Sequence, residues 1–341
     1  MIKAEVKTIE MFALSKVGRG ADSLKLTSLP RPVASQGQAL VRVLAAGVCG
    51  TDIHVANDEY SFEPPVVMGH EILGEVVSVG SAIDAVWVGS TVVCETYFST
   101  CEICDWCRAG RRNLCPHRRS LGSFENGGFA SFVVMPVANL HRLPTSLRGI
   151  EGVLAEPLAC VTQCLLDPPF ICAGDNVLVI GPGTVGQLAA QVAKSQGGTV
   201  TLAGLSRDAA RLLIAAELGL DTTTSLPDVE SYEVVIECSG SEAGASAGLR
   251  SAKRGGHYAQ MGIFGKAVTL PVDDILYKEL VVTSGFGSTA TSWTRAISLI
   301  ENGLVTLHPL ITKRVSIHEW ESAFAATAAG DGIKTVIIPD S

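Results

Sequence analysis

The stretch that decides the fold reads Asn176-Val177-Leu178-Val179-Ile180-Gly181-Pro182-Gly183-Thr184-Val185-Gly186. Its first half is apolar, as in a buried strand, and apolar residues recur with a helical period just beyond it. The Gly-x-Gly-x-x-Gly spacing suits a pyrophosphate, because the first glycine permits a tight turn, the second lets the backbone approach the anion, and the third lets helix and strand pack. The helix N-terminus then faces the anion. Strand, glycine loop and helix together predict a dinucleotide-binding unit.

Strands and helices alternate downstream of this unit. The pattern predicts strands at residues 199–203, 234–238 and 256–261, with helices at residues 207–218 and 242–252. Such alternation is typical of a doubly wound parallel sheet, the Rossmann arrangement. The chain is therefore predicted to be an α/β protein.

The end of the second strand bears on the choice of cofactor. It reads Ala203-Gly204-Leu205-Ser206-Arg207, without the carboxylate that binds the ribose 2′-hydroxyl of NAD. Ser206 and Arg207 suit a 2′-phosphate instead, so NADP is preferred over NAD. The alternative is that Arg207 is a solvated residue at the start of a helix. The residues expected to contact the cofactor are Gly181, Pro182, Gly183, Thr184, Val185, Gly186, Gly204, Ser206, Arg207 and Arg211.

Residues 48–71 bring together groups that bind zinc. Cys49, His70 and Glu71 offer a thiolate, an imidazole and a carboxylate, and three such ligands leave a fourth position open for substrate. The alternative is a buried cysteine beside an unrelated Gly-His-Glu turn. Short apolar segments broken by Gly and Pro predict a β-rich domain over residues 1 to about 150. The ligand stretch is expected on loops between its strands.

A second group of cysteines has the pattern C-x2-C-x2-C-x7-C. Four thiolates at this spacing close a tetrahedron around one ion and leave no position for substrate, which predicts a structural zinc. An iron–sulfur centre is the alternative. The members of the group are Cys101, Cys104, Cys107 and Cys115.

Length and composition narrow the class of protein. The 341 residues are enough for two domains. A formal charge of −8, with 26 basic and 34 acidic residues, argues against nucleic acid as a partner. No apolar run approaches bilayer length and the N-terminus lacks the apolar core of a signal peptide, so we expect no membrane partner and a cytoplasmic location. Clustered cysteines in that compartment indicate metal rather than disulfides.

With these motifs in order, the sequence resembles the zinc-containing medium-chain dehydrogenase/reductase family over essentially its whole length. Gly69-His70-Glu71-x2-Gly74-x5-Gly80-x2-Ile83 looks like the family's zinc signature, and Cys49-Gly50-Thr51-Asp52-Ile53-His54 like its first ligand loop. The cysteine group and the glycine loop resemble its structural zinc and its coenzyme site. The resemblance implies a GroES-like β-rich catalytic domain from residues 1–154 and 291–341, with the structural zinc lobe at about 94–117. A Rossmann domain for NAD(P) is expected at residues 155–290.

Within the family, Ala155-Glu156-Pro157-Leu158 is similar to the sorbitol, threonine and related polyol dehydrogenase branch. There the glutamate lies beside the catalytic zinc. Glu156 is therefore expected to bind the ion directly, to bind it through its water, or to exchange with Glu71. Asp52 resembles the acid that orients His70 through its other ring nitrogen.

The resemblance also implies a reaction. The alcohol loses its proton beside zinc, the Thr51 hydroxyl passes that proton through the cofactor ribose to His54, and hydride moves from the carbinol carbon to the nicotinamide. The alternative for His54 is an ordinary exposed histidine. The catalytic residues expected are Cys49, Thr51, His54, His70, Glu71 and Glu156, with Cys49, His70, Glu71 and Glu156 around the catalytic zinc.

The predicted protein is an oxidoreductase, a zinc-dependent alcohol or polyol dehydrogenase that converts a small secondary alcohol to the ketone with NAD(P). One alternative is a threonine or amino-alcohol dehydrogenase of the same branch, and another is a sensor that binds zinc and NADP without turnover. A quinone reductase of the superfamily would lack the zinc ligands. The family implies a homodimer or homotetramer. The aromatic residues expected around the cleft are Tyr60, Phe62, Tyr97, Phe98, Phe124, Phe264 and Phe286.

Overall fold

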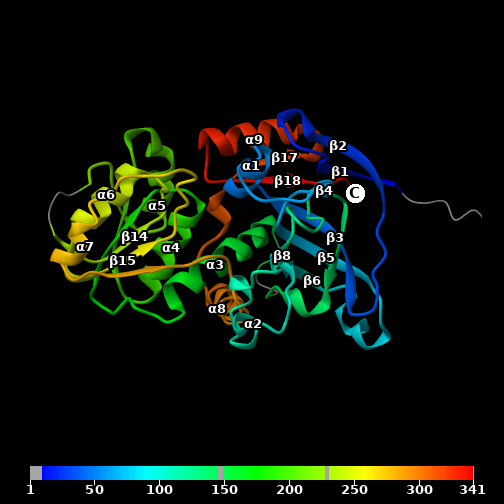
Figure 1. The fold of residues 1–341 in the computed structure, drawn as a ribbon, viewed down its shortest axis with the longest axis horizontal. Coiled ribbons are helices and arrows are strands. Elements are labelled where there is room, and N and C mark those ends of the chain that lie inside the picture. Colours follow the sequence, from blue (N-terminus) through cyan, green and yellow to red (C-terminus); the bar gives the residue numbers. More distant parts are fainter. Residues whose placement is uncertain (1–9, 145–146, 148, 227–229, 341) are drawn as a thin grey trace, which may run out of the picture.

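The computed structural model describes residues 10–144, 147, 149–226 and 230–340. Two lobes lie side by side, each built on its own large β-sheet (Figure 1). Among the described residues, no helix combines the length and the apolar character needed to cross a membrane.

One lobe contains a six-stranded sheet in the order β13-β12-β11-β14-β15-β16. All neighbouring strands are parallel, which confirms the doubly wound arrangement predicted from the alternation of strands and helices. The strands are β11 (Asn176–Ile180), β12 (Thr199–Ala203), β13 (Asp221–Thr223), β14 (Tyr232–Glu237), β15 (Ala252–Gln260) and β16 (Val281–Ser284). The helices are α4 (Thr184–Ser195), α5 (Ala209–Glu217), α6 (Glu242–Ser251) and α7 (Asp273–Tyr277).

The other lobe contains a seven-stranded sheet in the order β10-β6-β5-β3-β18-β17, with β9 also paired to β3. Strand β18, near the end of the chain, lies antiparallel to β3, near its beginning. The strands are β3 (Gln38–Gly47), β5 (Glu71–Val79), β6 (Thr91–Cys94), β9 (Phe132–Pro136), β10 (Leu140–Arg142), β17 (Ile311–Ser316) and β18 (Lys334–Ile338). Two smaller sheets contain β1 (Glu10–Lys16), β2 (Leu24–Pro30) and β4 (Val66–Val67), and β7 (Tyr97–Ser99) and β8 (Arg119–Ser120). The remaining helices are α1 (Gly50–Ala56), α2 (Asp105–Arg108), α3 (Ala155–Leu166), α8 (Ala290–Glu301) and α9 (Trp320–Ala329).

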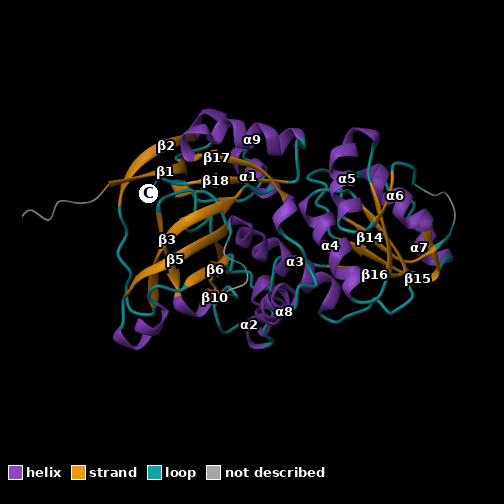
Figure 2. Ribbon diagram, turned by 180° about the vertical axis from the view of Figure 1, so that it is seen from behind, coloured by secondary structure: helices purple, strands orange, loops and turns teal. Residues whose placement is uncertain are grey.

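Helix α3 lies between the lobes (Figure 2). Every residue of α3 except Cys160 is buried, as expected for a helix that is apolar on all sides. It packs against α4 of one lobe and against α8, and one apolar core runs from Ala45 and Leu73 through α3 to Val179 in β11. This packing fixes Glu156, in the first turn of α3, between the two sheets.

The expectation that the ligand stretch lies on loops is wrong in two respects, of which the first is that Glu71 opens strand β5. The second is that residues 50–56 form helix α1, so Thr51 and His54 are helical and Cys49 is the N-cap. The helix starts there because the Asp52 carboxylate accepts a hydrogen bond of 2.8 Å from the Cys49 backbone N–H. Seven residues are too few for a helical period to show in the sequence.

Candidate active site

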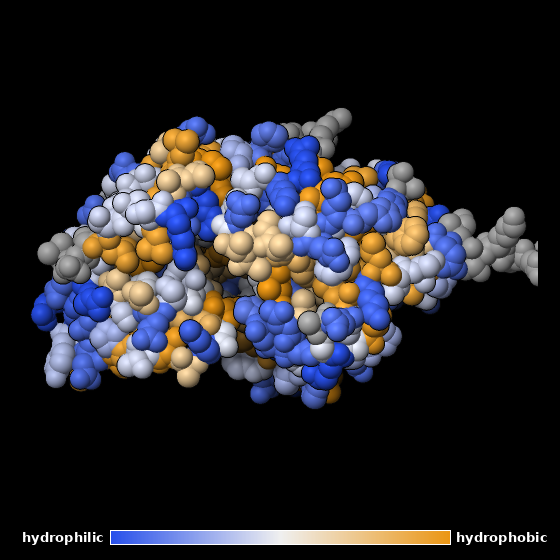
Figure 3. Space-filling view, turned by 90° about the horizontal axis from the view of Figure 1, so that it is seen from above, coloured by the Kyte–Doolittle hydropathy of each residue, from blue (hydrophilic) through white to orange (hydrophobic). Residues whose placement is uncertain are grey.

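A cleft of about 520 Å³ lies between the lobes. Seen from the side of α9, the surface is hollowed between the two halves (Figure 3). One lobe contributes the predicted ligands to its lining, and the other contributes Gly183, Thr184 and Val185 of the glycine loop together with Cys238 and Ser239. The cleft therefore brings the two motifs that the sequence singled out into one site.

Cys49, His70 and Glu71 converge in this cleft. Their ligand atoms all lie within 4.8 Å of one another. Gly69 makes the turn into His70 with a φ of 90°, and a Cβ there would come within 2.7 Å of the Phe129 ring, so only glycine fits. A thiolate, an imidazole and a carboxylate at this separation can hold one ion and leave a position open.

His70 is oriented by Asp52. Its Nδ1 lies 3.6 Å from the Asp52 carboxylate, and both side chains are nearly inaccessible. Burial alone would lower the pKa of His70, but the Asp52 charge and the Cys49 sulfur raise that pKa well above its ordinary value. The carboxylate thus fixes the ring so that Nε2 faces the site.

Glu71 has a partner that the sequence did not suggest. The Lys334 ammonium donates to both Glu71 carboxylate oxygens at 2.6 Å and to the Val48 carbonyl at 3.2 Å. The two side chains are 3% and 1% exposed. Burial raises the pKa of Glu71, and the Lys334 charge opposes that rise. A lysine opening an otherwise apolar strand was the one available signal, because such a cation needs a buried partner.

Glu156 lines the same cleft and is 6% exposed. Its Oε1 accepts hydrogen bonds from the Thr96 hydroxyl at 2.5 Å and from the Cys160 thiol at 3.5 Å. It is not part of the group whose ligand atoms lie within 4.8 Å. The structure therefore places Glu71 close to Cys49 and His70, and Glu156 farther along the wall.

The two residues predicted to form a proton relay, Thr51 and His54, occupy different depths. The Thr51 hydroxyl lies 3.7 Å from the Cys49 sulfur and lines the cleft. His54 lies one turn further along α1, where its Nδ1 is 2.7 Å from a Glu59 carboxylate oxygen and its side chain is 34% exposed. Thr51 thus faces the interior of the cleft and His54 faces solvent.

The four cysteines of the second group also converge. Their sulfurs all lie within 4.8 Å of one another, and none of the chain's ten cysteines forms a disulfide. Backbone N–H groups of Ile103 and Cys104 lower the pKa of Cys101 to about 6. Four sulfurs at this separation suit a closed tetrahedral ion.

The glycine loop has the geometry expected for a dinucleotide. Gly181 has a φ of 100°, and a Cβ at Gly186 would come within 1.8 Å of the Gly181 carbonyl oxygen. A Cβ at Gly183 would meet nothing within 4 Å, so this N-cap of α4 is open to a ligand. The tight turn at Gly181, the open backbone at Gly183 and the close packing at Gly186 therefore occur at the positions where the glycine spacing predicted them.

The end of β12 has a carboxylate and a second arginine close to Ser206 and Arg207. Ser206 and Arg207 are exposed in a 3-10 turn. The turn brings back Asp208, whose carboxylate accepts from the Leu205 N–H at 2.9 Å and lies 3.2 Å from Arg211 Nη1. Arg211 Nε also donates to the Gly332 carbonyl at 2.6 Å. Arg211 therefore joins the two lobes, and a carboxylate overlooked in the sequence lies beside the expected ribose site.

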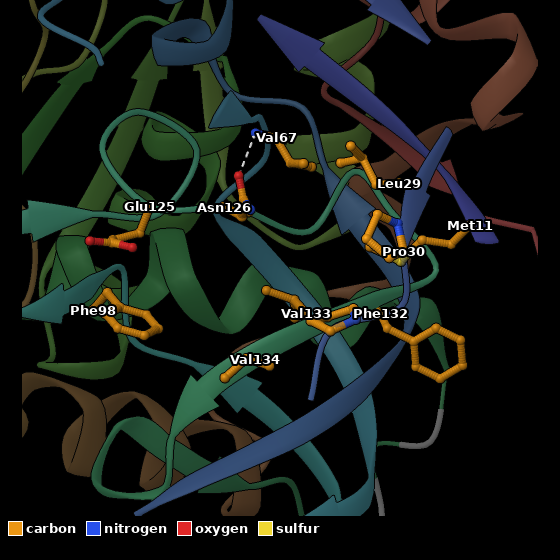
Figure 4. Close-up of a pocket in the computed structure, with 12 residues that line it drawn as sticks. Met11, Leu29, Pro30, Val67, Phe98, Glu125, Asn126, Phe132, Val133 and Val134 are labelled. Carbon is orange, nitrogen blue, oxygen red and sulfur yellow. Dashed lines mark hydrogen bonds between the residues drawn. The ribbon is translucent and has the colours of Figure 1, made fainter. Parts of the chain in front are cut away.

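The expected aromatic lining is partly wrong. Tyr60, Tyr97 and Phe286 line the cleft, whereas Phe62, Phe98, Phe124 and Phe264 are not among its lining residues. Phe98 instead lines a second hollow of about 330 Å³. Figure 4 shows this hollow between β1, β2 and β9, where the Asn126 side chain accepts from the Val67 N–H at 2.9 Å. None of the predicted catalytic, cofactor-binding or metal-binding residues lines it.

Comparisons with known proteins agree with this geometry. A family model described as "Alcohol dehydrogenase GroES-like domain" matches residues 35–145, and one described as "Zinc-binding dehydrogenase" matches residues 184–302. A sorbitol dehydrogenase from Halalkalibacterium halodurans is 36% identical over 96% of this chain and 99% of its own. A D-arabitol-phosphate dehydrogenase from Enterococcus avium is 32% identical over 96% of this chain and 97% of its own. A zinc-binding dehydrogenase from Sinorhizobium meliloti 1021, solved with NADP, superimposes with a TM-score of 0.88 at 31% identity, covering 97% of this chain and 100% of that one.

Proposed function

The chain belongs to the zinc-binding alcohol dehydrogenase family, in its polyol dehydrogenase branch, and we propose on this premise that its cleft oxidises a secondary hydroxyl of a polyol with NADP as the hydride acceptor. It is a zinc-dependent alcohol or polyol oxidoreductase that uses a nicotinamide cofactor. The observation that carries the proposal is the convergence of Cys49, His70 and Glu71 in a cleft shared with the glycine loop.

The charges of the cleft support a divalent cation. A metal would bind Cys49 as the thiolate, and the cleft also contains the carboxyl groups of Glu71 and Glu156, which are almost fully buried. Lys334 supplies one balancing positive charge. A divalent ion would offset further negative charge, whereas an uncompensated buried charge is costly.

We assign Glu71 to the ligand set with Cys49 and His70, and place Glu156 beside the open position. Glu71 lies within 4.8 Å of the other two ligand atoms, and Glu156 does not belong to that group. Glu71→Gln should therefore weaken zinc binding more than Glu156→Gln, whose effect should stay within the roughly 10- to 100-fold range for a group beside the ligands. A larger loss of zinc affinity in Glu156→Gln would reverse the assignment.

The residues of the cleft divide the chemistry between them. Zinc, when bound, supplies Lewis-acid polarisation of the substrate oxygen, and the nicotinamide accepts the hydride. The Thr51 hydroxyl, beside the Cys49 sulfur, would accept the proton of the substrate hydroxyl while giving its own proton to the ribose of the bound cofactor. His54, held by Glu59 at the surface, would take a proton from that ribose and release it to solvent. Residues 101–115 hold a second, structural zinc through four thiolates.

We propose NADP rather than NAD because Ser206 and Arg207 are exposed at the end of β12, and the similar Sinorhizobium meliloti structure was solved with NADP. Asp208 does not oppose a phosphate strongly, because Arg211 balances its charge. Arg207→Ala should reduce the ratio of kcat/KM for NADP to that for NAD about 10- to 150-fold, the range for hydrogen bonds to charged groups. Arg250→Ala, an exposed arginine on α6, is the matched control. A wild-type preference for NAD would contradict the assignment.

We propose a homodimer formed through β16. This strand is an edge of the six-stranded sheet, and its Val281 and Val282 are 53% and 46% exposed. An exposed apolar edge strand is a template for pairing with a second copy. Val281→Lys should yield monomers in analytical ultracentrifugation, and an unchanged sedimentation coefficient would refute this interface.

A cytoplasmic location is proposed because clustered thiolates are typical of a reducing compartment.

A panel of alditols and simple secondary alcohols, with NADP and NAD as acceptors, tests the function. The expected result is ketone formation from alditols and two zinc ions per chain by metal analysis. Bound zinc and NADP without turnover of any alcohol would favour a sensor.

We also propose the domain boundaries after residues 154 and 290, which fall at the starts of α3 and α8.

A further inference from the structure

Arg118 lies beside the cleft with most of its hydrogen-bonding capacity unused. Its Nη1 donates to the Cys115 carbonyl at 3.1 Å, and its guanidinium carbon lies 5.0 Å from the centre of the Phe286 ring. A guanidinium has five N–H donors. Among the described residues, no carboxylate forms an ion pair with Arg118. Its positive charge is therefore available to a ligand.

The partners of Arg118 place it at the cleft. Phe286, Tyr97 and Ser120 all line the cleft, and Ser120 follows Arg118 by two residues. Burial raises the pKa of the Tyr97 hydroxyl, and the Arg118 charge acts against that rise. The Arg118 charge is thus close enough to interact electrostatically with Tyr97, which lines the cleft.

The neighbouring arginine shows the contrast. Arg119 lies 3.0 Å from the Glu63 carboxylate and 2.5 Å from that of Glu125. Its charge is balanced by two carboxylates, whereas no carboxylate among the described residues pairs with Arg118. The two arginines are adjacent in sequence, but only the charge of Arg118 is left available to a ligand.

The cleft and its rim hold three kinds of group. Cys49, His70 and Glu71 form the candidate metal site. Residues with hydroxyl groups also line the cleft, namely Thr96, Tyr97, Ser120 and Ser123. Arg118 is not itself a lining residue, but its guanidinium lies over Phe286, which is. A metal site, several neutral hydrogen-bonding groups and a cation suit an extended polyol that ends in an anion.

We propose that Arg118 binds a terminal anionic group of the substrate, a phosphate or a carboxylate, and so selects alditols that carry such a group. The inference rests on the proposed alcohol oxidation and adds the substrate class to it. A planar guanidinium binds two oxygens of such an anion at once, and these charge-assisted hydrogen bonds are stronger than neutral ones. The Phe286 ring holds the guanidinium plane in place by a cation–π contact.

The test compares three substrates of equal carbon number: an alditol, its terminal phosphate and the corresponding aldonic acid. The ratio of kcat/KM for the anionic substrate to that for the neutral alditol is measured in the wild type, in Arg118→Gln and in the control Arg119→Gln. The wild-type ratio should be about 10 to 150, the range for hydrogen bonds to a charged group. In Arg118→Gln this ratio should fall towards one, because KM for the anionic substrate rises. Arg118→Lys should keep part of the preference for the anionic substrate, and Arg119→Gln should keep all of it. Preference for the phosphate or for the aldonate identifies the anion.

Calorimetric titration of the NADP-saturated enzyme with inorganic phosphate tests the anion site without turnover. Binding is expected in the wild type and in Arg119→Gln, and its loss in Arg118→Gln. Equal kcat/KM for neutral and anionic alditols would overturn the inference and leave alcohol oxidation standing. An anion preference that survives in Arg118→Gln would overturn the role of Arg118. If no alcohol is oxidised, the proposed function fails, and phosphate titration alone decides whether Arg118 forms an anion site.

Discussion

The two groups of proposed metal ligands differ in how the chain assembles them. The four sulfurs of the cysteine lobe come from residues 101–115, and local turns bring them together. The cleft group joins Cys49 to His70 and Glu71, and its balancing cation, Lys334, comes from β18 at the other end of the chain. A site with a full set of local ligands can be read from spacing, whereas an open site depends on residues that only the fold brings close.

The two groups also differ in charge. Three of the four lobe cysteines are half-buried, so water can stabilise an excess of negative charge there. In the cleft the carboxylates are almost fully buried, and the site needs Lys334 and a divalent ion to approach neutrality. We therefore expect the cysteine lobe to keep its ion bound and the cleft to use its ion in the reaction.

The largest expected effect follows from removing a cleft ligand. Cys49→Ser should lower kcat about 1,000-fold or more, because it removes several kcal/mol of Lewis-acid stabilisation. It should also reduce the zinc content from two ions per chain to one, while the circular dichroism spectrum is unchanged. Cys172→Ser, at an exposed cysteine outside both groups, is the control. Turnover close to the wild-type value in Cys49→Ser would refute the cleft assignment.

The next effect concerns the balancing cation. Lys334→Met should lower the free energy of unfolding by about 3–5 kcal/mol, because it leaves the Glu71 carboxylate buried without its partner. Adding Glu71→Gln in the same chain should restore part of that loss in denaturant titrations. Lys253→Met, in the partly exposed pair with Glu233, should cost less than about 1 kcal/mol. Equal losses in the two lysine variants would contradict the idea that the cleft needs an internal cation.

A smaller effect is expected at the surface end of the relay. His54→Ala should lower kcat about 10-fold, with partial recovery when imidazole is added to the buffer, because His54 transfers a proton but does not hold the metal. His318→Ala, at an exposed histidine paired with Asp340, is the matched control. A loss in His54→Ala as large as that in Cys49→Ser would place His54 in the metal site instead.

The smallest expected effect is a difference between the reactivity of a lobe thiol and that of a core thiol in the zinc-free protein. Cys101, with its pKa lowered to about 6 by backbone N–H groups, should react with iodoacetamide at a rate that rises through pH 6 and levels off above pH 7. Cys94, whose pKa burial raises far above its ordinary value, should stay unlabelled at pH 7. Mass spectrometry of labelled peptides measures both, and zinc should protect Cys101. Equal labelling of the two thiols would remove the expected difference between lobe and core.

The sequence predicted the parts of the molecule whose signals are local. The glycine loop with its strand and helix indicated the parallel sheet, and cysteine spacing indicated the lobe, because each depends on neighbours in the chain. Helix α1 was missed because it is short and starts on an Asp52 cap rather than on an apolar period. Lys334 was missed because Glu71, its partner, lies far away in sequence. Asp208 was overlooked because a 3-10 turn returns it to the strand end.

Stepwise removal of zinc from the wild-type enzyme tests the central claim most directly. Chelator is added in increments, and zinc content, turnover and unfolding temperature are measured on the same samples. The account predicts that turnover falls in proportion to the first zinc lost, that the unfolding temperature drops mainly with the second, and that one added equivalent restores activity. Turnover that survives the loss of the first ion, or an unfolding temperature that falls with it as steeply as with the second, would contradict the division between a working site and a structural one.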